Sequence, residues 1–246
     1  MPNPPPGPIE EPAKPGKETV IAREFKVIKA RLLDEARSAV GMLETALRAL
    51  FESDRDAANE VVRGDDRIDR EEVAIEERVF QLMALQAPVA KDFRSLAFAL
   101  KVNSDIERVA DHACSIAKVA RKIDAENPPN WPTALVEMGQ RVPMMCHALL
   151  RAMADEDADA AKLIIQGDKT IDALHKQLFE ETVDLLDSGV QPNAVGLLVY
   201  RVGRELERVG DLMGNIAEDI VYLATGEIIR HQKRRERQQE LPGDRL

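Results

Sequence analysis

A seven-residue stretch occurs twice in this chain, and it limits the folds that the chain can adopt. It reads DIERVAD at residues 105–111 and ELERVGD at residues 205–211. Each copy places a glutamate and an aspartate at positions i and i+4, so that two carboxylates lie on one face of a helix. Like charges at this spacing repel by about 0.2–0.5 kcal/mol in water, and by more when they are buried. The chain therefore needs either a cation or facing basic side chains at both places.

A second pair of similar segments precedes the first pair, one in each half of the chain. GDDRID at residues 64–69 matches GDKTID at residues 167–172, and both carry two aspartates in a DxxxD pattern. The segments recur in the same order at nearly the same offset, which indicates an internal duplication. Each half is thus expected to pair a helix bearing DxxxD with a helix bearing ExxxD.

The apolar residues around these motifs follow a helical period. Between Phe25 and Leu50, for example, apolar side chains recur every three or four positions. Aromatic residues make up only 4% of the chain, which is typical of packed helices rather than of β-sandwiches or barrels. Breaks rich in proline, glycine or acidic residues separate the periodic segments. We predict helices over residues 17–54, 55–85, 88–120, 133–154, 158–186 and 192–225.

The predicted fold class is therefore all-α, with two tandem three-helix bundles related by internal duplication. The proline-rich residues 1–16 are expected to form a disordered arm, because repeated prolines lack the N–H donors of a helix. The other expected segments are a first bundle at 17–126, a linker at 127–132, a second bundle at 133–228 and a basic flexible tail at 229–246.

The charge and the apolar runs exclude several classes of function. The formal net charge is −10, so the chain has no basic footprint for nucleic acid. No run of about 18 apolar residues is present, and we expect a cytoplasmic protein that does not insert into a membrane. Cys114 and Cys146 stand too far apart for a zinc ribbon or a CxxC redox motif, so two free buried thiols are expected.

The acidic motifs could form two metal sites. Carboxylate oxygens from neighbouring helices suit Mg, Mn or Fe, with Ni and Zn as further candidates. The alternative is that these carboxylates are solvated or paired with Arg94, Arg108, Arg201 and Arg208. No ExxH pairs of a ferritin-like di-iron site, nucleophile triad or phosphate-binding loop can be placed, so we expect no enzymatic activity. The candidate ligands are Asp65, Asp69, Glu107 and Asp111 in the first half and Asp168, Asp172, Glu207 and Asp211 in the second.

Several motifs together resemble the PhoU family of phosphate-signalling accessory proteins. QAPVAKDFR at 86–94 is similar to the family's QxPxAxDLR segment, and ERVADHA at 107–113 is similar to its ERIGDHA segment. In the second half, ERVGD at 207–211 and NIAE at 215–218 resemble the family's ERIGDxxxNIAE. The resemblance covers roughly residues 18–228.

The resemblance implies two three-helix bundles packed end to end. It also implies iron or zinc clusters on Glu107, Asp111, Glu207 and Asp211, with Asp65, Asp69, Asp168 and Asp172 as supporting carboxylates. Cofactors are thus expected to be metal ions.

By the same resemblance, the protein is expected to hold the phosphate-starvation response and phosphate uptake in check. It would act as an adaptor between the ATPase subunit of the ABC phosphate transporter and a sensor histidine kinase. A homodimer is also expected, because apolar surface on helical bundles often pairs. Two other hypotheses remain open, a carboxylate-bridged metalloenzyme and a purely structural helical scaffold.

Overall fold

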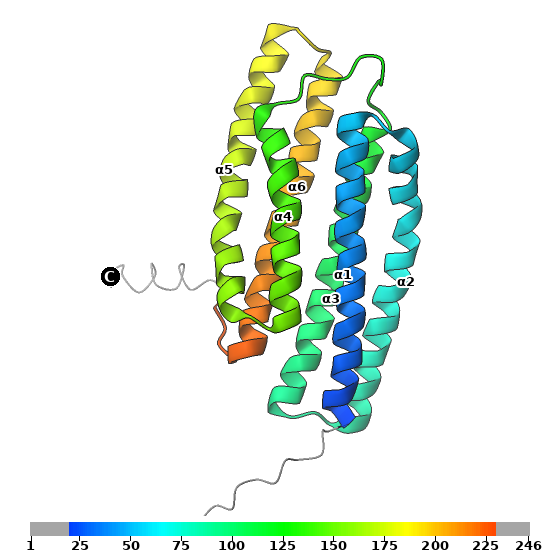
Figure 1. Ribbon diagram of the computed structural model, residues 1–246, viewed down its shortest axis with the longest axis vertical. Helices are drawn as coiled ribbons and strands as arrows, with labels where there is room; N and C mark the ends of the chain where they lie inside the picture. Colours follow the sequence, from blue (N-terminus) through cyan, green and yellow to red (C-terminus); the bar gives the residue numbers. More distant parts are fainter. Residues whose placement is uncertain (1–19, 230–246) are drawn as a thin grey trace, which may run out of the picture.

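Six helices make up the part of the chain that the computed structural model describes, residues 20–229 (Figure 1). No strand occurs within these residues, and the all-α prediction is confirmed. The expected proline-rich arm and almost all of the expected basic tail lie outside the described residues. The helices are α1 (Val20–Glu52), α2 (Arg55–Gln86), α3 (Ala90–Ala120), α4 (Thr133–Asp155), α5 (Ala158–Ser188) and α6 (Asn193–Thr225).

The turns between α1 and α2 and between α4 and α5 are built in the same way. Asp54 and Asp157 each precede the second helix of their half, and each side chain accepts hydrogen bonds from two backbone N–H groups at 2.9–3.0 Å. Such caps satisfy donors that the first helical turn leaves without partners. The residue before each cap, Ser53 or Glu156, has a positive φ of 57° or 53°. The duplication therefore extends to the local geometry of the turns.

The two halves pack side by side and not end to end, so that expectation was wrong. Figure 1 shows α1 beside α4 and α3 beside α6 along the long axis of the molecule. The Nζ of Lys101 lies 3.1 Å from Oδ1 of Asp219, and Nδ1 of His112 lies 2.7 Å from Oε2 of Glu205. These two contacts fix α3 and α6 in an antiparallel arrangement, because the higher number on one helix meets the lower number on the other.

The width of the apolar surface on α3 explains this packing. Val109 and Ala110 are both buried, and so are Ala113 and Cys114. Neighbouring positions on a helix point in directions about 100° apart, so α3 buries more than one stripe. A helix with that much apolar surface must be covered both by its own bundle and by the other one.

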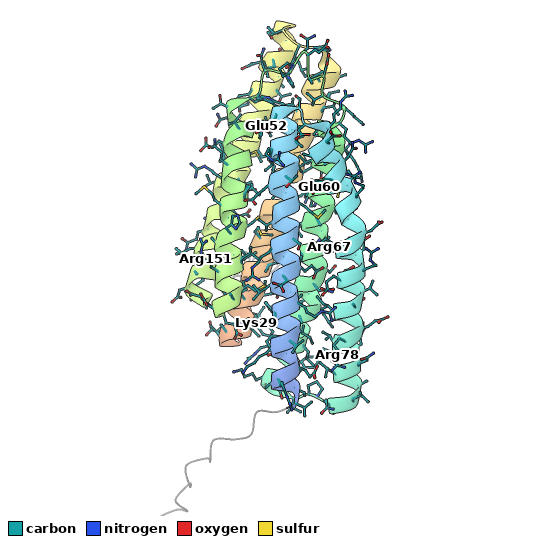
Figure 2. All side chains as sticks on the ribbon, turned by 45° about the vertical axis from the view of Figure 1, so that its right-hand side comes forward. Lys29, Glu52, Glu60, Arg67, Arg78 and Arg151 are labelled. Carbon is teal, nitrogen blue, oxygen red and sulfur yellow. The ribbon has the colours of Figure 1, made fainter. Side chains whose placement is uncertain are left out.

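Contacts between α1 and the α4 region close the other side of the interface. The ring of Phe51 packs edge to face against Trp131, with centroids 5.2 Å apart. A Cβ at Gly139 of α4 would lie 3.0 Å from Cε2 of Phe51. The amine of Lys29, labelled in Figure 2 on α1, donates to Glu156 at 2.7 Å. The halves are thus joined by apolar packing at one end of α1 and by an ion pair towards the other.

Two further expectations can be compared with the structure. Cys114 and Cys146 are free and buried, as predicted. In the part of the chain that the structure describes, none of the helices carries an apolar stretch long enough to span a membrane.

Candidate metal sites

Three carboxylates of the second bundle converge at one point between α5 and α6. Asp168 and Asp172 stand one turn apart on α5, and Asp211 faces them from α6; each offers one oxygen, and these oxygens lie within 4.8 Å of one another. A Cβ at Gly210 would lie 3.1 Å from Oδ1 of Asp168. The glycine therefore lets the Asp168 carboxylate approach the backbone of α6 closely.

The electrostatics of the second bundle indicate that a fourth carboxylate is near. Burial, followed by the charges of Asp172, Asp211 and Glu207 in that order, raises the pKa of Asp168 to about 6. All four candidate residues of this half thus belong to one electrostatic group. A cation would offset both the cost of burying the charged carboxylates and the repulsion between them.

One arginine competes for this group. Arg208 lies 3.2 Å from Oδ2 of Asp211 and 3.6 Å from Oε2 of Glu207, and about half of its side chain is exposed. An exposed pair of this kind contributes about 0–1 kcal/mol. The guanidinium balances part of the negative charge and is free to swing towards solvent.

The four candidate residues of the first bundle also influence one another. Burial, followed by the charges of Asp111, Glu72, Asp69 and Asp65, raises the pKa of Glu107 to about 7. Burial likewise raises the pKa of Asp69, and so do Asp65 and Asp111. The oxygens of this group stand further apart than those of the second bundle, since only the latter meet the 4.8 Å spacing among the described residues.

A backbone difference accompanies the wider spacing. Ala110 occupies the place in the first ExxxD motif that Gly210 occupies in the second, and it is fully buried. In the second bundle, the carboxylate of Asp168 lies against the place where a Cβ of residue 210 would be. Ala110 has a Cβ at the equivalent place of the first bundle, so aspartates on α2 have less room to approach α3.

Pairing with arginine accounts for few of the eight candidate carboxylates. Arg108 lies 3.4 Å from Asp105, and Arg201 lies 3.5 Å from Glu205. Arg94 lies over the ring of Tyr222, 5.9 Å from its centroid. Within residues 20–229, only Arg208 among the four arginines named as alternative partners makes an ion pair with a candidate ligand.

Glu72 is a member of the first group that the ligand prediction omitted. Burial raises its pKa, and so do the charges of Glu76, Asp69 and Asp111. A signal was present in the sequence, because Glu72 continues the acidic stripe three positions after Asp69. In the second half, His175 stands three positions after Asp172. Its ring stacks on Tyr200, and its buried Nε2 has no hydrogen-bond partner among the residues that the structure describes.

The donor set fits a hard or borderline divalent cation. Both groups consist of carboxylates, and the pKa is raised for Glu107 in the first group and for Asp168 in the second. The basic side chains nearby therefore do not fully neutralise the negative charge of these groups. Such oxygen-only sets suit Mg, Mn and Fe, and they leave room for water ligands. Burial raises the pKa of the Cys114 and Cys146 thiols to about 12, so the candidate ligands are carboxylates and not thiolates.

Comparison with known proteins decides the family. The PhoU domain matches the chain twice, at residues 32–120 and at residues 135–220. The chain belongs to the PhoU family. The two PhoU matches correspond to the two three-helix bundles and include all eight candidate carboxylates.

Relatives resemble the chain over most of its length. A phosphate-specific transport system accessory protein PhoU homologue from Clostridium acetobutylicum is 29% identical over 209 residues, covering 84% of this chain and 95% of that protein. The homologue of the same name from Aquifex aeolicus is 32% identical over 218 residues, covering 88% and 98%. The crystal structure of the phosphate transport system regulatory protein PhoU from Streptococcus pneumoniae matches with a TM-score of 0.79 at 28% identity, covering 85% of this chain and 99% of that one.

Proposed function

We propose that this protein is a metal-binding regulator of phosphate uptake that represses the phosphate-starvation response when phosphate is abundant. It acts in the cytoplasm as an adaptor between the ATPase subunit of the ABC phosphate transporter and a sensor histidine kinase. It performs no catalysis, and a homodimer is its proposed assembly.

The regulatory part of this proposal is supported by the relatives. The Clostridium and Aquifex proteins are named accessory proteins of phosphate transport, and the Streptococcus protein is named a regulatory one. The chain covers 95% or more of the Clostridium and Aquifex proteins. Coverage of that extent means that no large catalytic domain distinguishes those proteins from this chain.

The convergence of Asp168, Asp172 and Asp211 carries the metal-binding part. An ion held there would join α5 to α6, and an ion held by Asp65, Asp69, Glu107 and Asp111 would join α2 to α3. When bound, the metal supplies positive charge that offsets the repulsion between carboxylates. The helices would then keep a fixed relative position, which suits a protein that presents helical faces to partners.

A reporter of the phosphate-starvation response tests the regulatory role. With the gene deleted, the reporter should be active in abundant phosphate, and the restored gene should silence it. The double variant Asp168→Asn, Asp211→Asn should restore less repression than the wild type, whereas Asp184→Asn, an exposed aspartate of α5, should restore it fully. A silent reporter in the deletion strain would contradict the role as repressor.

Measurements on the purified protein test the site and separate the alternatives. The chelator-treated protein should bind Mn²⁺, and the double variant should lose binding at the second bundle without loss of helicity. Turnover of a phosphoester by the metal-loaded protein would favour the metalloenzyme alternative instead. No binding of Mn²⁺, Fe²⁺ or Zn²⁺ at all would favour the structural scaffold.

A further inference from the structure

The chain turns back on itself where α6 ends. Gly226 follows the helix with a φ of 81°, and its N–H donates to the backbone oxygen of Tyr222 at 2.9 Å. A glycine in this left-handed conformation is a common way to end a helix and redirect the chain. A Cβ at residue 226 would collide with Nη1 of Arg94 on α3, so the turn lies against the first bundle. Figure 1 shows the last described residues running back beside the end of α6.

These returning residues border a pocket between α3 and α6. Its volume is about 330 Å³, and Phe98 and Lys101 of α3 border it together with Glu218 and Asp219 of α6. Ile229 borders it as well and packs, partly buried, against the apolar core. Ile229 therefore anchors the chain at this pocket, and the residues that follow start from there.

A second pocket continues the first one along α6. Its volume is about 340 Å³, and it is bordered by Arg208, Asp211 and Glu218 of α6, by Arg108 of α3 and by Asp168 of α5. Glu218 borders both pockets, so the two are neighbours. We call the two pockets together the α3–α6 groove.

Acidic side chains outnumber basic ones along the α3–α6 groove. The basic residues that border it are Lys101, Arg108 and Arg208, and the acidic ones are Asp168, Asp211, Glu218 and Asp219. Each basic group already contacts an acid; the pairs are Lys101 with Asp219 at 3.1 Å, Arg108 with Asp105 at 3.4 Å and Arg208 with Asp211 at 3.2 Å. The groove thus has an excess of negative charge, which suits a basic ligand.

The sequence supplies a basic segment directly after Ile229. Residues 230–237 read RHQKRRER, with five basic side chains and one acidic side chain in a protein whose formal net charge is −10. Because the segment is joined to a residue that borders the groove, its effective concentration there is in the range of about millimolar. A weak attraction between opposite charges is therefore enough to hold it.

The segment is also long enough to follow the groove. Eight extended residues span about 26 Å. Asp211 lies about 16 Å before Tyr222 along α6, since a helix rises about 1.5 Å per residue. Residues 230–237 can therefore reach from Ile229 past Glu218 to the far end of the groove.

We propose that residues 230–237 bind in the α3–α6 groove of their own chain, with their basic side chains around Glu218. The bound segment keeps basic segments of other proteins out of this groove, so the contact is autoinhibitory. This role goes beyond the proposed function and does not depend on a bound metal.

Zero-length crosslinking of the full chain tests this proposal. A carbodiimide joins a carboxylate to an amine only where the two are in contact, and Lys233 is the only lysine after residue 229. The chelator-treated protein is crosslinked, separated on a denaturing gel and mapped by mass spectrometry. Glu218→Gln removes the central carboxylate, and Lys233→Arg keeps the charge but removes the amine. Glu180→Gln is the matched control, because Glu180 is an exposed glutamate of α5 that borders neither pocket.

We expect the main crosslink of Lys233 to join Glu218 within one chain and to disappear in Lys233→Arg. Glu218→Gln should lower the yield of crosslinked Lys233 by about fivefold or more, the effect of losing one ion pair, whereas Glu180→Gln should leave it unchanged. Salt at about 1 M should lower it too, because it screens the attraction.

Three results would overturn the proposal. The first is crosslinks of Lys233 spread over carboxylates outside the groove, or no crosslink of Lys233 at all. The second is an equal yield in Glu218→Gln and Glu180→Gln. The third is a crosslink between two chains, seen as a band of doubled mass, which would assign the groove to the segment of a second copy.

Discussion

Glu35 of α1, which is 3% exposed, gives a testable prediction about stability. Replacing it with Met removes a buried carboxyl that has no hydrogen-bond partner among the described residues. Met is the residue of the second bundle at this place, because Met138 stands as far before Asp157 as Glu35 stands before Asp54. We expect Glu35→Met to stabilise the metal-free protein by about 1–3 kcal/mol, the usual cost of a buried polar group without a partner. Urea unfolding in the presence of a chelator measures this. Met138→Leu conserves volume and should change stability by less than about 1.5 kcal/mol in comparison.

A loss of stability in Glu35→Met would mean that the carboxyl has a favourable contact in the metal-free protein.

Arg208 gives a second prediction at the scale of single residues. Its guanidinium contacts Asp211 and Glu207, so it competes with a cation for the second group of carboxylates. We expect Arg208→Gln to tighten Mn²⁺ binding at this site by up to about fivefold, which corresponds to an exposed pair of less than about 1 kcal/mol. Titration of a Glu107→Gln, Asp111→Asn background isolates the second site. Weaker binding in Arg208→Gln would show that the arginine orders the carboxylates instead of competing with the ion.

The candidate residues show what could be deduced from the sequence. The ExxxD and DxxxD pairs could be assigned because spacing along a helix places both members on one face. Glu35 was missed, although a charged residue on the apolar stripe between Leu32 and Ala39 was a visible signal. Its lack of a partner could not be deduced, because that depends on which side chains of other helices surround it.

At the scale of the helices, glycines set how closely two of them approach. A Cβ at Gly203 would collide with Cδ2 of Leu178, which is fully buried, whereas a Cβ at Gly41 would meet no described atom within 4 Å. We expect Gly203→Ala to destabilise the protein by about 1–3 kcal/mol through overpacking between α5 and α6. Gly41→Ala is the matched control and should stabilise it by up to about 1 kcal/mol, because alanine favours the helix. Thermal and urea unfolding of both variants measure the difference.

Equal effects of the two substitutions would contradict close packing at Gly203. A stabilised Gly203→Ala would show that Leu178 moves aside easily and that the contact between α5 and α6 is loose there.

The helices were easier to predict than their arrangement. Apolar periodicity and the breaks at residues 53–54, 87–89 and 189–192 are local properties, so the helix bounds followed from them. The side-by-side packing of the bundles depends on the second buried stripe of α3 and on contacts such as Phe51 with Trp131. Those contacts join residues far apart in the sequence, and no local pattern specifies which faces meet.

For the whole molecule, the raised pKa values predict how stability depends on pH. The pKa values of Glu35, Glu107 and Asp168 lie at about 8, 7 and 6 in the folded protein, above the ordinary values of 4.5, 4.5 and 3.8. Between the ordinary value and the raised value, the folded protein holds a proton that the unfolded chain has released. The contribution of these three groups to the free energy of unfolding is therefore fully present below about pH 4, and it is lost as the pH rises through 6 to 8.

We accordingly expect the urea concentration at the unfolding midpoint of the chelator-treated protein to decrease as the pH rises from 5 to 8. Saturating Mn²⁺ should flatten or reverse this slope, because the ion takes the place of the protons and binds better as the carboxylates ionise. Glu35→Met should reduce the slope in the chelator-treated protein between about pH 5 and pH 7, where folded Glu35 holds a proton that the unfolded chain has released. A midpoint that stays constant from pH 5 to pH 8 without metal would mean that the acidic groups are already balanced within the protein. The two bundles would then hold their carboxylates without needing a cation, as the scaffold hypothesis requires.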